Sequence, residues 1–105
     1  MDIDFSSEGK VLTAKFKGEL DHHNSQTARE KTDIMLDLGI YDKLIFDFSG
    51  LTFMDSSGIA VIMGRVKRLS SLNGKVSVIC KNEKISRILK LSGVDRYVTL
   101  EEGEF

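Results

Sequence analysis

The chain has 105 residues, a formal net charge of −1, 41% hydrophobic residues and 30% charged residues. These values predict one globular domain over residues 1–105, with little room for the deep cavity of a large enzyme. The near-neutral charge and the absence of a long apolar run argue against direct binding to nucleic acid or a membrane. The acidic start lacks a secretory pattern, so we expect a cytoplasmic protein.

Hydrophobic periodicity predicts strands that alternate with helices along the chain. Residues 11–17 alternate between apolar and polar side chains, and residues 6–9 are typical of a turn that joins them to a partner strand. A helix is expected to begin at Asn24 or Ser25, since either residue can cap it. The expected strands are 3–5, 11–17, 43–48, 76–79 and 97–100, and the expected helices are 24–38, 57–72 and 85–91.

This order of elements indicates the fold class. Strands that are joined through helices are normally parallel and have right-handed crossovers. We therefore expect an α/β fold, namely one small domain with a mixed, mostly parallel open sheet of four to five strands and three to four helices. The aromatic side chains of Phe46, Phe48 and Phe53 are expected in its core, together with Met54.

Two polar segments follow neighbouring strands and lead directly into helices. They are Gly18-Glu19-Leu20-Asp21-His22-His23 and Phe53-Met54-Asp55-Ser56-Ser57-Gly58. In open α/β sheets, functional groups gather beyond the carboxyl ends of the strands. We therefore expect Asp21 and Ser56 to lie on the same edge of the sheet.

The residues of the second segment allow several interpretations. Ser56 or Ser57 could simply cap the helix, or the free N–H groups of the helix start could accommodate a phosphate on a serine. Gly58 would let another molecule approach the backbone. A nucleophilic serine with a histidine base is a further alternative, although the G-x-S-x-G pattern lacks its first glycine.

The first segment contains two adjacent histidines, His22 and His23. Neighbouring histidines in one loop seldom bind the same ion, and no third ligand has useful spacing. We therefore expect no metal at this position. No phosphate-binding or dinucleotide-binding glycine pattern occurs either, and no cofactor is expected.

Both segments, in this order, resemble the signatures of the STAS domain found in bacterial anti-anti-sigma factors, and most of all those that act in sporulation. The second signature extends to Ile59, and Leu91-Ser92-Gly93 matches a further element of the family. The resemblance covers about residues 3–100. It implies a regulatory switch protein and not an enzyme.

The resemblance also implies partners and site residues. Such a protein binds an anti-sigma factor that is also an ATP-dependent serine kinase, and binding releases the sigma factor. The kinase then phosphorylates the serine after the motif aspartate, here Ser56, and a PP2C-type phosphatase removes the phosphate. The residues expected to face the partner are Asp21, His22, Asn24, Asp55, Ser56, Ser57, Gly58, Ile59 and Met63.

Two further functions remain open at this point. STAS domains also act in the general stress response, where the same switch would serve a different sigma factor. Alternatively, Asp21 and the helix start at Ser56 could contact a nucleotide, which would make the chain a nucleotide-binding STAS module.

Overall fold

The computed structural model describes residues 1–103, so the last two residues of the expected domain 1–105 lie outside it. Strands and α-helices follow one another in the predicted order, and a short 3-10 helix is added near the end. The elements are β1 Asp2–Glu8, β2 Val11–Leu20, α1 His22–Asp37, β3 Lys43–Met54, α2 Ser56–Ser70, β4 Lys75–Cys80, α3 Glu83–Ser92, η1 Val94–Arg96 and β5 Thr99–Glu102.

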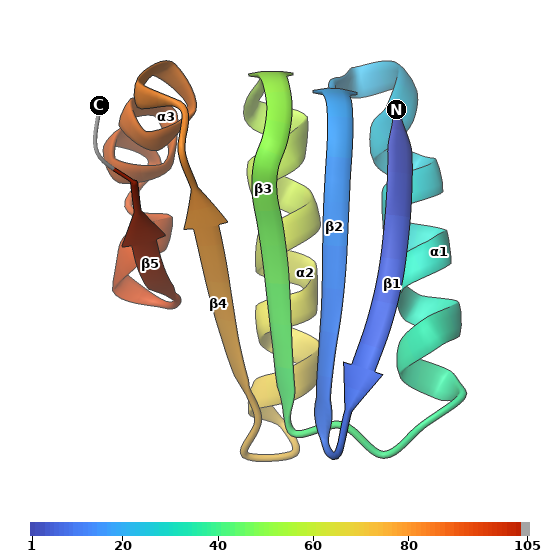
Figure 1. Cartoon of the computed structure of the whole chain (residues 1–105). Helices are drawn as coiled ribbons and strands as arrows, with labels where there is room; N and C mark the ends of the chain where they lie inside the picture. The colour runs from blue at the N-terminus through green and yellow to red at the C-terminus, as the bar shows by residue number, and fades with distance from the viewer. Residues whose placement is uncertain (104–105) are drawn as a thin grey trace.

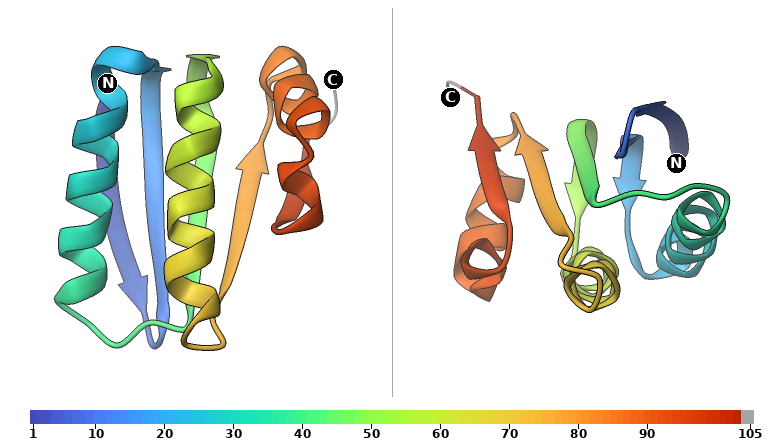
Figure 2. Two further views of the ribbon diagram at one scale, coloured as in Figure 1. Left: turned by 180° about the vertical axis from the view of Figure 1, so that it is seen from behind. Right: turned by 90° about the horizontal axis from the view of Figure 1, so that it is seen from below.

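The five strands form one sheet in the order β1-β2-β3-β4-β5 (Figure 1). β1 pairs with β2 in an antiparallel manner, and the other neighbours are parallel. The three α-helices cover one face of the sheet and leave the other face open (Figure 2). The predicted fold class is therefore confirmed. Within residues 1–103, every helix is too short or too polar to span a bilayer.

The open face stays in contact with water because its central positions are charged. Lys15 on β2 lies opposite Asp4 on β1 and opposite Asp47 on β3. Opposite charges in neighbouring strands stabilise the pairing modestly, and they need no covering layer. Because side chains alternate along a strand, the neighbouring residues of β2 and β3 point to the helices instead.

Three phenylalanines form the centre of the core between the sheet and the helices. Phe16, Phe46 and Phe48 are fully buried, and their ring centroids lie 5.2–5.8 Å apart. Phe16 contacts the other two rings edge to face, as the quadrupole of aromatic rings favours, and the rings of Phe46 and Phe48 are tilted against each other by 40°. The expectation that Phe53 also lies in the core is wrong. It is 46% exposed, because the next residue of the strand, Met54, occupies the inward position.

β3 is longer than predicted and ends at Met54. Ser49 and Gly50 are typical of a strand end, but the strand continues through an irregularity where its pairing with β2 shifts register. The backbone N–H and the hydroxyl of Ser49 both donate to Asp47 Oδ1, at 3.0 and 2.6 Å. A Cβ at Gly50 would lie 2.8 Å from the carbonyl oxygen of Phe16. Glycine therefore permits a close approach of two backbones here and does not end the strand.

Other boundaries move by a few residues. β1 extends to Glu8, so the hairpin turn is at residues 9–10 and not at 6–9. β5 begins at Thr99, because residues 94–96 form the 3-10 helix η1 and delay the strand. These shifts do not alter the position of the two segments that carry the candidate site.

Candidate functional site

The two polar segments meet at the carboxyl ends of β2 and β3, at the top of Figure 1. The last residues of these strands, Leu20 and Met54, are partners in the sheet register. The following residues, Asp21 and Asp55, therefore start their helices from adjacent positions, and the backbone N–H of Asp55 donates to the carbonyl of Leu20 at 3.3 Å. We call this surface the rim. The rim consists of residues 21–24 and 55–58.

The same local structure starts both helices of the rim. Asp21 has φ −119° and ψ −175°, and Asp55 has φ −112° and ψ −171°, so both residues are extended caps. The carboxylate of Asp21 accepts from the backbone N–H of Asn24 at 3.1 Å. The carboxylate of Asp55 accepts from the backbone N–H of Ser57 at 2.8 Å. Each aspartate thus satisfies an N–H group that the helix itself leaves without a partner.

These caps correct two predictions about the helix starts. Asn24 or Ser25 was the predicted cap of α1, and Ser56 or Ser57 was a possible cap of α2; the caps are instead the aspartates that precede each helix. The signal was present in the sequence, because aspartate is as good a cap as serine. Since Asp55 caps α2, Ser56 occupies the first helical position and is exposed to solvent.

Asp55 also connects the two halves of the rim. Its second carboxylate oxygen accepts from the backbone N–H of His22 at 3.3 Å. In the first half, the side-chain amide of Asn24 donates to the carbonyl of Glu19 at 2.9 Å. The two loops are therefore held to each other and to the end of β2, and they present one continuous surface.

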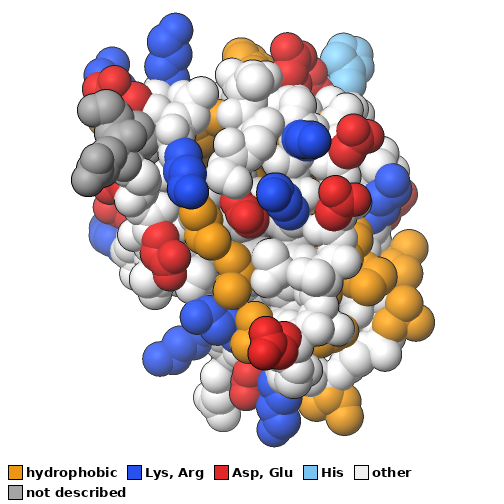
Figure 3. All heavy atoms as spheres, in the orientation of Figure 1, with side chains coloured by type: hydrophobic (Ala, Val, Ile, Leu, Met, Phe, Trp, Pro, Cys, Tyr) orange, Lys and Arg blue, Asp and Glu red, His pale blue; other side chains and the backbone are white. Residues whose placement is uncertain are grey.

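The predicted site residues differ in how much of each is exposed. His22 and Ser56 are exposed, and Figure 3 shows a histidine beside acidic side chains at the top of the molecule. The half-buried residues are Asp21, Asn24, Asp55, Ser57, Ile59 and Met63. Ile59 and Met63 lie on α2 below the rim, where part of each apolar side chain remains accessible.

Gly58 is buried and faces the sheet. A Cβ at this position would lie 2.5 Å from Met54 Cγ and 3.2 Å from Leu20 Cδ2. The absence of a side chain therefore allows the first turn of α2 to lie close to the ends of β2 and β3. The structure therefore gives this glycine a packing role within the domain, and the approach of another molecule to its backbone stays a prediction.

Replacement by alanine should have opposite effects on stability at two glycines of α2. Gly58→Ala should destabilise the protein by about 1–2 kcal/mol, because the overlap with Met54 outweighs the gain in helix propensity. A Cβ at Gly64 meets nothing within 4 Å, so Gly64→Ala should stabilise the protein by up to ~1 kcal/mol. Urea unfolding of both variants measures these changes, and shifts of equal sign would contradict the packing described for Gly58.

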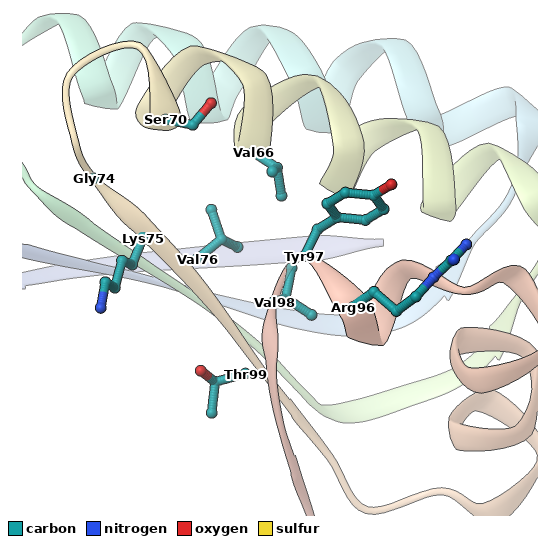
Figure 4. Close-up of a pocket in the computed structure, with 9 residues that line it drawn as sticks. All are labelled: Val66, Ser70, Gly74, Lys75, Val76, Arg96, Tyr97, Val98 and Thr99. Carbon is teal, nitrogen blue, oxygen red and sulfur yellow. The ribbon is translucent and has the colours of Figure 1, made fainter.

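The rest of the described chain offers other surfaces, but they lie away from the rim. A groove of about 300 Å³ opens between the second half of α2 and the η1–β5 segment (Figure 4). In it, the guanidinium of Arg96 lies 5.9 Å from the centre of the Tyr97 ring.

The remaining candidate groups for chemistry are a cysteine and possible metal ligands. Cys80 is fully buried, and burial raises the pKa of its thiol, which disfavours the reactive thiolate. Residues 1–103 contain no group of three or more His, Cys, Asp or Glu side chains that could hold a metal ion.

Comparison with known proteins identifies the class of this fold and site. The family model described as "STAS domain" matches residues 2–104, and the chain belongs to this family. The anti-sigma F factor antagonist of Paenibacillus polymyxa is 31% identical over 104 residues, which cover 99% of this chain and 89% of the relative.

Solved structures agree with this assignment at the level of the fold. SpoIIAA, an anti-sigma factor antagonist, has been solved in its unphosphorylated form; it matches with a TM-score of 0.84 and 23% identity, over 98% of this chain and 89% of the other. The phosphorylated form of SpoIIAA, from Bacillus, matches with a TM-score of 0.75 and 23% identity, over 98% and 92% of the two chains.

Proposed function

We propose that this chain is an anti-sigma factor antagonist controlled by phosphorylation of Ser56. In its unmodified form, the rim binds an anti-sigma factor that is also a serine kinase, and the bound sigma factor is released. The kinase transfers a phosphoryl group from ATP to Ser56, which weakens the complex. A PP2C-type phosphatase removes the phosphate and restores binding. The chain itself acts as a binding partner and substrate, not as an enzyme.

The position of Ser56 carries this proposal. Its side chain is exposed at the first position of α2, on a surface built from both loops. A kinase can reach such a hydroxyl without unfolding the helix. The positive end of the helix dipole also lies at this position, so a phosphate there costs the folded state little. The names of the relatives support the assignment of the partner as an anti-sigma factor.

The surrounding residues fit a surface that is covered when a partner binds. His22 and Asn24 in the first half of the rim offer polar contacts, and the partly exposed Ile59 and Met63 on α2 offer apolar contacts. A mixed surface of this kind, with apolar side chains beside polar groups, is typical of transient protein interfaces. Gly58 contributes to the surface indirectly, because it sets the distance between α2 and the sheet.

Phosphorylation mapping tests the proposal directly. The protein is incubated with Mg-ATP and a candidate anti-sigma factor kinase, and the modified peptide is identified by mass spectrometry. We expect one phosphate on Ser56 in the unaltered protein and in Ser57→Ala, and none in Ser56→Ala. Ser57→Ala is the matched control, because the two hydroxyls are neighbours. Modification of Ser57, or no modification by a kinase that binds the protein, would overturn the assignment of Ser56.

A further inference from the structure

Helix α1 buries few large apolar side chains, although it carries half of the rim; Met35 is half-buried against the core. Its buried side chains are small or polar in three of four positions, namely Ser25, Ala28 and Thr32, and only Leu36 is large. By contrast, α2 buries large apolar side chains such as Ile62 and Leu69. Small side chains form few interlocking contacts, so apolar packing alone defines the axis of α1 poorly.

An ion cluster between the two helices supplies directional contacts. Asp33 of α1 faces two arginines of α2: Arg65 Nε lies 3.2 Å and Arg68 Nη1 lies 3.3 Å from Asp33 Oδ1. Arg68 also pairs with Asp37, one turn further along α1. α1 and α2 run side by side on the sheet (Figure 2, left), and the cluster joins them in their C-terminal halves, away from the rim.

Burial of the Arg65 guanidinium in this cluster costs the fold stability. The side chain of Arg65 is only 11% exposed, and neither Nε nor Nη1 has a hydrogen-bond partner within the described chain. The Nε atom is close enough to Asp33 for an ion pair, but its N–H is not directed at the carboxylate. Burial is the main cause that lowers the pKa of Arg65, which means that the fold disfavours its charge.

A group that costs stability and is nevertheless buried suggests a role other than stability. Buried charges can select one packing arrangement over others, even where an apolar residue would be more stable. Here the buried charge of Arg65 would select the direction of the α1 axis relative to α2. From Asp33 to His22 the helix spans roughly 16 Å, so a tilt of about 5° moves the first turn by more than 1 Å. Asp55 holds that first turn through His22, and the cluster provides a second fixed point.

We propose that Arg65 is a positioning residue, which fixes α1 against α2 through Asp33 and thereby sets the two halves of the rim in the arrangement that the partner recognises. The proposal rests on the proposed function, since the partner is the anti-sigma factor. It assigns to Arg65 a role in binding affinity without contact with the partner.

Arg65→Met tests this role, because methionine has a similar length and no charge. Asp33 keeps its contact with Arg68 in this variant, so no carboxylate is left without a partner. We expect an unchanged or higher Tm, together with about tenfold weaker binding of the anti-sigma factor in calorimetry. The amide chemical shifts of residues 21–24 should also change in the free protein. Arg87→Met is the matched control, since Arg87 forms an exposed ion pair with Glu83 on α3. In this control, the affinity for the anti-sigma factor and the amide shifts of residues 21–24 should stay unchanged.

The outcomes separate this inference from the proposed function. Unaltered affinity, or unaltered amide shifts in residues 21–24, overturns the positioning role of Arg65. A large fall in Tm that accounts for the loss of binding overturns it too, because the residue would then be structural. If the unaltered protein binds no anti-sigma factor, the proposed function fails, while the amide shifts of the free protein still decide whether Arg65 positions α1.

Discussion

Phosphorylation of Ser56 should weaken binding to the anti-sigma factor about a hundredfold, which corresponds to ~3 kcal/mol. A phosphate adds about −1.5 to −2 charges at neutral pH. On the rim, this charge lies beside the carboxylates of Asp21 and Asp55, which already cap the two helices. Burying three clustered negative groups against a partner requires their desolvation, and each unmatched charge raises that cost.

Calorimetric titration of the unmodified and phosphorylated proteins measures the effect. Ser56→Ala should bind like the unmodified protein, because removal of the exposed hydroxyl disturbs no cap. Ser56→Asp should weaken binding less than phosphate does, since one carboxylate carries less charge. The Tm of the phosphorylated protein should stay within a few degrees of the unmodified value, because the charge lies at the favourable end of α2. Equal affinities of the two forms would refute the switch.

The architecture of this domain was predictable because its signals are local. The 3.6-residue period of α2 and the alternation along β2 each follow from one stretch of chain, and their order determines the topology. The position of the rim followed as well, since parallel strands end at the same edge of a sheet. Its partner-facing residues are still predictions.

Other features depend on contacts between distant parts of the chain. The extension of β3 past Gly50 requires the carbonyl of Phe16 as its close neighbour, and the role of Gly58 depends on Met54 and Leu20. The contact of Arg65 with Asp33 joins two helices that are separated by a strand. The periodicity of one helix cannot reveal such a pair, because the pattern of each helix alone predicts that its charged residue lies on a solvated face. The caps are different: their aspartates were visible, but serine and asparagine competed for the same position.

Asp55→Ala should cause the largest loss of stability among the rim substitutions, about 2 kcal/mol, because caps of this kind contribute up to roughly that amount. The carboxylate bonds to the backbone N–H of Ser57 at 2.8 Å and to that of His22 at 3.3 Å. Its removal leaves the first turn of α2 uncapped and detaches the two loops from each other. In a domain of this size, the expected fall in Tm is roughly 10 °C. Asp21→Ala is the comparison, because Asp21 caps one helix only, and it should cost about 1 kcal/mol.

Asp55→Asn separates the cap from the charge. The amide oxygen of asparagine can still cap α2 through the N–H of Ser57, but its amide nitrogen cannot accept from the N–H of His22, so the Tm should lie between those of Asp55→Ala and the unaltered protein. The negative charge beside Ser56 is lost, however, and phosphorylation should then weaken partner binding by less than the hundredfold expected above. Differential scanning calorimetry of the three variants and titration of phosphorylated Asp55→Asn measure both effects. If Asp55→Asn is as unstable as Asp55→Ala, the bond to Ser57 contributes little, and the charge of the carboxylate or its bond to His22 supplies the stability. If phosphorylation weakens binding of Asp55→Asn as strongly as that of the unaltered protein, the carboxylate of Asp55 takes no part in the switch, and the phosphate acts without it.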